Sequence, residues 1–261
     1  MNAGPPLKAW RERDGRLLRL RLARPKANVI DAELIAALDA AVAGAAQAGE
    51  ETCALRAVLL DHEGPHFSFG ASVQEHLPAT SAAMLHGLHA LLLRLLAFPL
   101  PILVAVRGQC LGGGLELAAC GSQIFAAPDA KLGQPEVLLG VFAPAASCLL
   151  PERIGQAAAE DLLLSGRSID GREAHRLGLV QVVADDPEAA ALAWFDQHLA
   201  GRSASSLRFA VSAVREGRLE RVRSQLAAAE ALYLGPLMSS RDAVHGLTSF
   251  LEKRAPAWED R

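Results

Sequence analysis

The chain has 261 residues, 51% of them apolar, and a formal net charge of −3. This length and apolar content are enough to bury a substantial core in one large domain, or in a core with a smaller appendage. The slightly acidic balance gives no overall positive field, so neither nucleic acid nor an anionic membrane is an expected partner.

Four cysteines lie in apolar stretches without CxxC spacing: Cys53, Cys110, Cys120 and Cys148. They predict buried free thiols in a reducing compartment, with neither disulfides nor zinc. His86 and His89 are three residues apart on one predicted helix, but no third ligand accompanies them, so no metal site is expected.

No membrane span or secretion signal is predicted. The first 16 residues lack an apolar signal core. The most apolar segment, residues 88–108, is interrupted by Arg94, Pro99 and Pro101, which favours a buried helix followed by a buried strand. We therefore expect a cytoplasmic, soluble protein.

Hydrophobic periodicity divides the first part of the chain into strands and helices. Residues 17–22 alternate leucine with arginine, which predicts a half-buried strand. Asp31 is a predicted helix N-cap, because apolar residues follow it at helical spacing. Three more elements are predicted: a strand at 58–61, a helix at 81–98 with Thr80 as N-cap, and a strand at 102–106.

The second part of the chain ends in helices. Strands are predicted at 124–127 and 180–183, with short helices at 157–164 and 172–177 between them. From about Pro187 onward only helical patterns occur. The mixed order of strands and helices predicts an α/β fold of parallel character. We divide the chain into a core that holds the active site, residues 1–186, and a helical oligomerisation region, residues 187–261.

A run of three glycines, residues 112–114, follows the predicted strand at 102–106. Gly108 and Gly113 have GxxxxG spacing, but Gly114 and Leu115 stand where a phosphate-binding loop needs lysine and serine or threonine. A nucleoside triphosphate site is therefore not expected. A strand, a glycine turn and a helix instead expose backbone N–H groups at the helix N-terminus, which can stabilise an oxyanion.

Two glutamates lie among apolar residues in and after this segment. Glu116 falls in the first turn of the predicted helix, where a carboxylate could simply complement the helix dipole, worth about 0.3–1 kcal/mol. Glu136 follows Pro135 in an apolar context, and its burial without a partner would be costly, unless an arginine pairs with it. Two carboxylates in one apolar pocket would have pKa values pushed apart, so that one acts as acid and the other as base.

These segments together resemble the crotonase, or enoyl-CoA hydratase/isomerase, superfamily. The stretches AVRGQCLGGGLELAAC and KLGQPEVLLGV are similar to its active-site signature. Further similarity extends from ARPKANVIDAELIAAL to GLTSFLEKRAPAW, so the likeness spans nearly the whole chain. It implies a spiral of ββα units and a C-terminal helical region that joins subunits into trimers or pairs of trimers.

The resemblance also implies the chemistry of the site. The substrate would be an acyl-CoA thioester, with CoA as part of the substrate and with no separate cofactor or metal. Its carbonyl would lie between the N–H groups of Ala71 and Gly113, which stabilise the enolate. Glu116 and Glu136 match the pair that holds one water in hydratases of the family. Lys26 matches a position near the CoA phosphates.

Two segments depart from the family pattern. The loop reads FSFGAS instead of FSAGAD, with Phe69 and Ser72 at the changed positions. Residues 142–151, FAPAASCLLP, stand where the family has PGAGGTQRL, which predicts a reshaped acyl pocket suited to a flat ring. We therefore assign Ser72, Val73 and Phe142 to substrate binding.

The two departures together are similar to hydratases of a cyclic dienoyl-CoA in anaerobic benzoyl-CoA degradation. That resemblance implies attack of water at the ring carbon β to the thioester and protonation at the far end of the second double bond. Two alternatives stay open. One is a general 2-enoyl-CoA hydratase of linear or branched chains, and the other is a non-catalytic relative that binds acyl-CoA or RNA.

Overall fold

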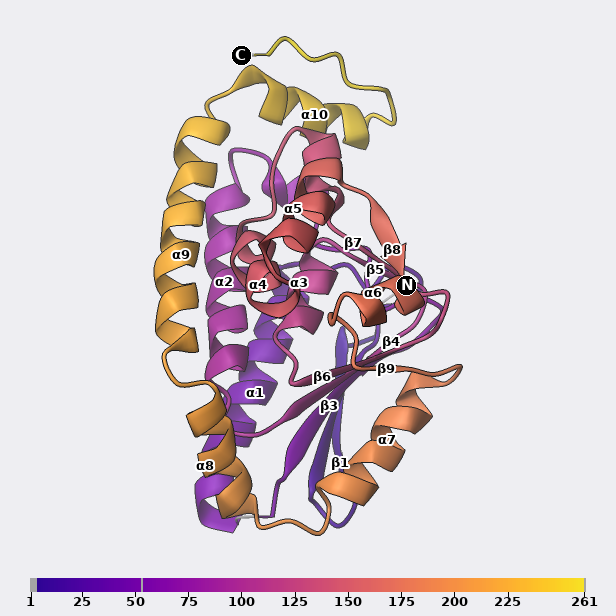
Figure 1. The fold of residues 1–261 in the computed structure, drawn as a ribbon. Coiled ribbons are helices and arrows are strands. Elements are labelled where there is room, and N and C mark those ends of the chain that lie inside the picture. Colours follow the sequence, from indigo (N-terminus) through magenta and orange to yellow (C-terminus); the bar gives the residue numbers. More distant parts are fainter. Residues whose placement is uncertain (1–3, 53, 261) are drawn as a thin grey trace.

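The computed structural model describes residues 4–52 and 54–260, which form two sheets surrounded by helices (Figure 1). The larger sheet has six strands in the order β1 (Leu7–Glu12), β2 (Leu17–Leu22), β3 (Ala57–His62), β4 (Ile102–Val106), β6 (Gln123–Ala126) and β9 (Val182–Val183). The smaller sheet has three: β5 (Gln109–Leu111), β7 (Lys131–Gly133) and β8 (Ser168–Asp170). In the larger sheet β1 is antiparallel to β2, and the strands from β2 to β9 run parallel.

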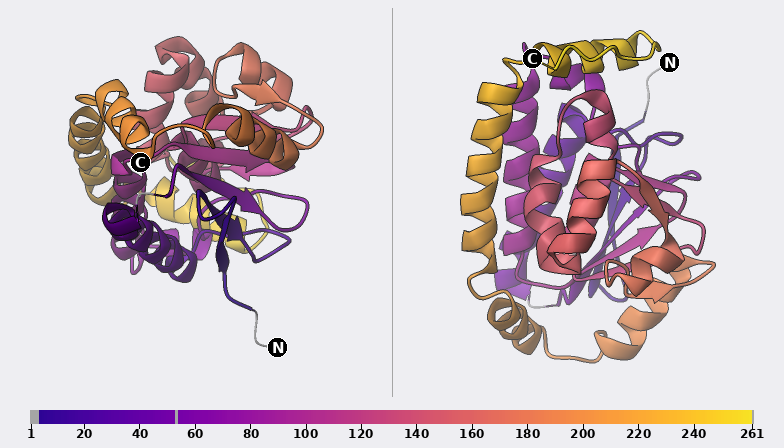
Figure 2. Two further views of the ribbon diagram at one scale, coloured as in Figure 1. Left: turned by 90° about the horizontal axis from the view of Figure 1, so that it is seen from below. Right: turned by 45° about the horizontal axis from the view of Figure 1, so that its top comes forward.

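Helices cover both faces of the larger sheet (Figures 1 and 2). On one face, α7 (Pro187–His198) packs Phe195 against Phe125 and neighbouring strand residues. The other face carries the main core, to which α1 (Ala32–Thr52) and α2 (Ser81–Ala97) contribute. Because its central strands are buried from both sides, β4 reads as an unbroken apolar run, ILVAV.

Strand β2 is more deeply buried than its alternating pattern predicts. We expected a half-buried strand, but Arg19 is only 3% exposed and Arg21 is half-buried. Both arginines bind Asp61 of β3, and both pair with Glu188 at the start of α7. The alternation of leucine and arginine correctly predicts a strand with one polar face. That face is covered because α7 packs over it and brings the carboxylate of Glu188 to the arginines.

Most of the predicted elements are confirmed. Strands β2 and β4 have the predicted bounds. Asp31 caps α1 through a bond of 2.9 Å from Leu34 N, and Asp170 caps α6 (Gly171–Arg176) through 2.7 Å from Glu173 N. Thr80 precedes α2 as predicted but makes no capping bond, because its hydroxyl donates to Leu77 O instead.

Sequence periodicity did not find several short elements. It missed β1, β5, β7, β8 and the helix α4 (Pro144–Ile154). Helix α4 carries proline at its first position and at Pro151, which hides it from a pattern search, although proline is well tolerated at a helix start. Two 3₁₀ turns, η1 (Val73–His76) and η2 (Pro135–Leu139), were also missed.

Beyond Pro187 the described residues form helices only, as predicted. They are α7, α8 (Ala204–Val214), α9 (Arg218–Leu232), a π-helical turn η3 (Tyr233–Leu237) and α10 (Arg241–Leu251). Helix α9 runs alongside α2 and contacts α4, and α10 lies across the end of the molecule against η1 and η2 (Figure 1). The C-terminal helices therefore reach the part of the fold that holds the glycine run. Their predicted role between subunits stays a prediction.

Three of the four cysteines, Cys110, Cys120 and Cys148, are buried free thiols as expected, and Cys53 lies outside the described residues. Within the described ranges, no helix combines the length and the apolar character that a bilayer crossing requires. His86 and His89 both pair with Glu230 of α9, at 3.1 Å and 2.5 Å, so they serve as a contact between α2 and α9.

Candidate active site

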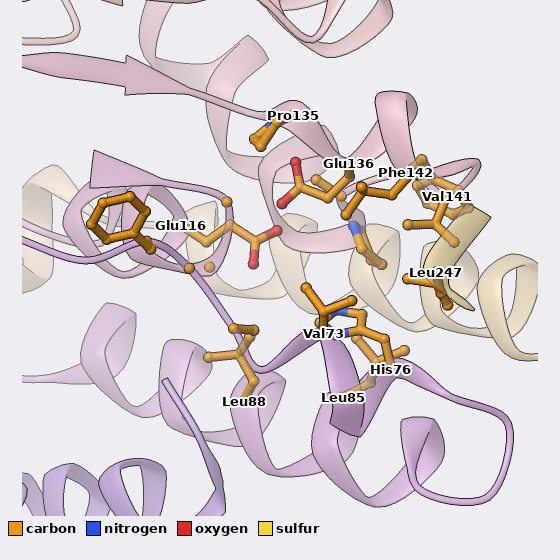
Figure 3. Close-up of a pocket in the computed structure, with 18 residues that line it drawn as sticks. Val73, His76, Leu85, Leu88, Glu116, Pro135, Glu136, Val141, Phe142 and Leu247 are labelled. Atoms are coloured by element: carbon orange, nitrogen blue, oxygen red, sulfur yellow. The ribbon is translucent and has the colours of Figure 1, made fainter. Parts of the chain in front are cut away.

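A cavity lies where the loop before η1, the glycine run, η2 and α10 meet (Figure 3). Six of the predicted site residues line it: Ala71, Val73, Gly113, Glu116, Glu136 and Phe142. Two do not, since Ser72 and Lys26 lie outside the lining and Lys26 is exposed. Substrate binding by these last two residues stays a prediction.

Glu116 occupies the first turn of α3 (Gly113–Ala119) and is 4% exposed. Its Oε1 accepts a hydrogen bond of 2.8 Å from Ala146 N, in the first turn of α4. Burial nevertheless raises the pKa of Glu116 to about 7, because the backbone N–H groups of Ala146 and Ala145 offset only part of the lost hydration. The segment that departs from the family pattern thus forms the helix that holds one carboxylate.

Glu136 lies in η2, half-buried, on another wall of the cavity. Burial, and then the nearby Glu116 charge, raise the pKa of Glu136 to about 8. Within residues 4–52 and 54–260 no arginine pairs with Glu136, so the salt bridge considered from the sequence is absent. Gln134 is buried beside it and donates to Oε2 at 3.0 Å and to Oε1 at 3.1 Å when its amide nitrogen faces the carboxylate, the orientation that satisfies both groups.

Gly112 explains why the glycine run precedes the first glutamate. Its φ of 51° lies in the left-handed region that side chains rarely adopt. A Cβ atom there would lie 2.6 Å from Oε1 of Glu136, which is closer than real Cβ contacts come. Glycine at 112 therefore makes the turn possible and leaves room for the second carboxylate.

The backbone at Ala71 and Gly113 comes close together at the same cavity. A Cβ atom placed on Gly113 would lie 3.2 Å from Ala71 N. In the described part of the chain, neither N–H donates to a backbone carbonyl or a side chain. Two unpaired amides on the cavity wall can bind an oxygen atom that gains negative charge, provided they point at it.

Several residues of this site were missed from the sequence. His76 and Leu247 line the cavity, and Tyr233 packs its ring against Phe142 and His76. Leu247 belongs to α10, so the segment assigned to oligomerisation also contributes to the cavity. One signal was available for Tyr233, because it is the only tyrosine in the chain and stands in an apolar helix.

Two carboxylates that share a low-dielectric cavity can exchange protons with a small molecule between them. In Figure 3 the side chains of Glu116 and Glu136 point toward one another. With both pKa values raised toward neutrality, a state with one proton on the pair is populated near neutral pH. Such a pair can remove one proton and deliver another, while the amides at 71 and 113 hold an oxyanion.

Comparisons with known proteins agree on one family. The model of the enoyl-CoA hydratase/isomerase family matches residues 12–261. The chain is 66% identical, over 99% of both sequences, to cyclohexa-1,5-dienecarbonyl-CoA hydratase of Thauera aromatica. It is 29% identical to carnitinyl-CoA dehydratase of Proteus mirabilis, over 95% of this chain and 96% of the relative.

Solved structures give the same result. The crystal structure of an enoyl-CoA hydratase/isomerase from Pseudoalteromonas atlantica T6c superposes with a TM-score of 0.82 and 29% identity, covering 97% of this chain and 99% of that one. At 20% identity, an enoyl-CoA hydratase from Bacillus halodurans shares the fold, with a TM-score of 0.84 over 94% of this chain and 99% of that one. The chain therefore belongs to the enoyl-CoA hydratase/isomerase family.

Proposed function

We propose that the protein hydrates cyclohexa-1,5-diene-1-carbonyl-CoA to 6-hydroxycyclohex-1-ene-1-carbonyl-CoA in the anaerobic degradation of benzoyl-CoA. Support for the ring substrate comes from the 66% identity to the Thauera aromatica hydratase. It also comes from aromatic residues around the cavity, where Phe142 lines the wall and Tyr233 packs behind it. An apolar wall of this kind suits a flat six-membered ring.

The observation that carries the hydratase proposal is a pair of glutamates that face one another and that no cation among residues 4–52 and 54–260 pairs with (Figure 3). In the proposed reaction, one carboxylate takes a proton from a water as its oxygen bonds to the ring carbon β to the thioester. The electrons of that double bond move toward the thioester oxygen, where the N–H groups of Ala71 and Gly113 stabilise the dienolate. Each such donor contributes about 3–4 kcal/mol to catalysis in comparable sites.

The dienolate carries negative charge at the far end of the second double bond as well. The other glutamate donates its proton to that ring carbon, and the remaining double bond shifts to the position next to the thioester. One water has then been added across the ring. The proton that it lost is on the first glutamate, and the proton of the second glutamate is on the ring carbon. The pair returns to its starting state by proton exchange across the emptied cavity.

A comparison of two substrates tests the proposal. We expect kcat/KM for cyclohexa-1,5-diene-1-carbonyl-CoA to exceed kcat/KM for crotonyl-CoA by about tenfold or more, because the rings around Phe142 suit a flat acyl group. A preference for crotonyl-CoA would favour a general 2-enoyl-CoA hydratase. No turnover of any enoyl-CoA, with tight binding retained, would favour a non-catalytic acyl-CoA-binding protein.

We further infer that the protein acts in the cytoplasm as a homotrimer or a pair of trimers. Buried free thiols are consistent with a reducing compartment. Support for self-association comes from large apolar side chains that are exposed on the C-terminal helices, among them Phe209 (74%) and Val214 (86%). Light scattering on the purified protein tests this inference, and a monomer at micromolar concentration would contradict it.

A further inference from the structure

Tyr233 carries a buried hydroxyl group for which the described residues offer no partner. The residue is 0% exposed, and within the described residues its Oη has no hydrogen-bond partner. It stands at the start of η3, a π-helical turn after α9, and such turns are frequent at functional sites. Because buried polar groups normally have partners, an exception of this kind calls for a ligand or a water.

The ring contacts of Tyr233 place the residue next to the cavity. Its ring packs edge-on against Phe142, with centroids 5.5 Å apart, and lies 6.4 Å from the ring of His76. Both of these neighbours line the cavity. After burial, the charges of Glu136 and then Glu116 further raise the pKa of Tyr233, so the phenol stays protonated and is a hydrogen-bond donor near both carboxylates.

His76 supplies the complementary acceptor. Its Nδ1 lies 2.8 Å from the carbonyl oxygen of Ser72, which can only accept, so Nδ1 carries the proton. Burial lowers the pKa of His76, which keeps the imidazole neutral and leaves Nε2 with a free lone pair. In Figure 3 His76 lies near Val73, across the cavity from Glu136. The acceptor therefore lies in the cavity wall, and the ring that carries the donor packs directly behind that wall.

We propose that Tyr233 and His76 form a recognition pair for a hydroxyl group on the acyl ring, with Tyr233 Oη donating to its oxygen and His76 Nε2 accepting its proton. A hydroxyl group is both donor and acceptor, so it satisfies both partners at once. The inference rests on the proposed function, because only the hydrated ring carries such a group. The diene has no oxygen atom on its ring, so water binds to Tyr233 and His76 when the diene is in the cavity.

The pair thereby distinguishes the hydrated product from the diene. A site with buried polar partners for a hydroxyl discriminates against an analogue that lacks it, since the partners are then left to weaker contacts. Tyr233 and His76 are specificity-determining residues in this account, and the proton transfers stay with the glutamates.

Replacing Tyr233 with phenylalanine tests the inference, because it removes one oxygen atom and keeps the ring contact with Phe142. The measurement is the inhibition constant of the hydroxylated product divided by KM for the diene, in the wild type and in Tyr233→Phe. We expect this ratio to rise about tenfold, the usual weight of one hydrogen bond between buried groups. An unchanged ratio would overturn the inference.

A second variant tests the acceptor. His76→Asn keeps an amide N–H near the position of Nδ1 for Ser72 O but removes the Nε2 acceptor, so the same ratio is expected to rise severalfold. Phe142→Leu is the matched control on the same wall, because it changes the contact area without removing a polar atom. It is expected to alter the binding of diene and product alike and to leave the ratio within twofold.

Thermal unfolding of Tyr233→Phe separates a ligand-binding hydroxyl from a structural one. Removing a buried polar group that has no partner should leave the melting temperature unchanged or raise it. A fall of more than about 2 °C would show that the hydroxyl stabilises the fold, which would overturn the inference. If the wild type turns over the diene but the ratio is unaffected, the inference fails and the proposed function stands. If the wild type does not turn over the diene, the proposed function fails, and the inference with it.

Discussion

The molecule buries two groups of charges, one between the sheet and α7 and the other beside the glycine run, and it treats them in opposite ways. In the first group Arg19 and Asp61 are 3% and 1% exposed, and Arg21, Glu12 and Glu188 extend the network. Although burial opposes its charge, the hydrogen bond from Arg19 lowers the pKa of Glu188. Each charge in this network has an opposite charge beside it.

The second group has two carboxylates, and no cation in the described part of the chain pairs with them. The hydrogen bonds found there for Glu116 and Glu136 come from neutral groups, and burial raises the pKa of both. A fold that needed only stability would have paired or removed them, because unpaired buried charge is costly. The difference between the two groups separates charges that hold the fold together from charges kept ready for proton transfer.

Replacing one of the unpaired carboxylates should produce the largest effect on activity. We expect Glu136→Gln to lower kcat by about 10³-fold, within the range of 10² to 10⁴ for a lost general acid or base. The fold should be retained, since an amide costs less to bury than a carboxylate. Steady-state kinetics on the cyclic diene and urea unfolding of the same preparation provide the measurement.

Glu116→Gln is the matched variant, and a comparable loss is expected from it. Asp196→Asn serves as control, because Asp196 pairs with Arg13 at the surface and should leave kcat unchanged. If either glutamine variant kept more than about a tenth of wild-type kcat, that glutamate would not be the acid or the base.

Replacing a paired carboxylate should instead act on stability. Asp61→Asn removes the buried carboxylate that Arg19 and Arg21 share and leaves Arg19 with two half-buried partners, Glu12 and Glu188, so the free energy of unfolding is expected to fall by about 3–5 kcal/mol. The exposed pair of Asp196 provides the control again, with an expected loss below about 1 kcal/mol. Equal losses in the two variants, measured by urea unfolding, would remove the distinction between buried and surface pairs.

The pH dependence of the free energy of unfolding also distinguishes the two groups of buried charges, and it requires no measurement of activity. Folding raises the pKa of Glu116 from 4.5 to about 7 and that of Glu136 from 4.5 to about 8. Between pH 4.5 and 8 these two glutamates therefore hold more protons in the folded chain than in the unfolded chain. Their contribution to the free energy of unfolding should fall as pH rises through this window, by on the order of a few kcal/mol.

The variant with both Glu116→Gln and Glu136→Gln checks the origin of that slope. It lacks the two raised pKa values, so its unfolding free energy should change less between pH 4.5 and 8 than that of the wild type. Parallel curves for the two proteins in urea titrations at several pH values would assign the slope to other groups.

The smallest effect is expected at the edge of the paired network. Glu188 is half-buried. When Glu188 is neutralised, Arg19 and Arg21 still form ion pairs with Asp61. Glu188→Gln should therefore lower the free energy of unfolding by about 1 kcal/mol and leave kcat unchanged. A loss as large as that of Asp61→Asn would mean that the carboxylate from α7, rather than the one in β3, balances the arginines.

The sequence was enough to predict most of the longer strands and helices and six of the residues that line the cavity, for different reasons. Strands β2 and β4 follow from local periodicity, and the pairing of Glu116 with Glu136 follows from the resemblance of their segments to the active-site signature of the family. The paired network could not be predicted, because Glu188 reaches Arg19 across 169 positions and only the packing of α7 brings them together. The same kind of long-range packing brings Leu247 into the cavity wall and Tyr233 behind it.

Hydration of the cyclic diene in D₂O tests the central claim, that Glu116 and Glu136 add one water across the ring, most directly. Analysis of the product by NMR should find one deuterium on carbon, at C3, the ring position opposite the hydroxyl-bearing C6. That result requires a proton donor at the far end of the second double bond, as the facing glutamates provide. Deuterium at the ring carbon that bears the thioester, or no hydrated product, would contradict the account.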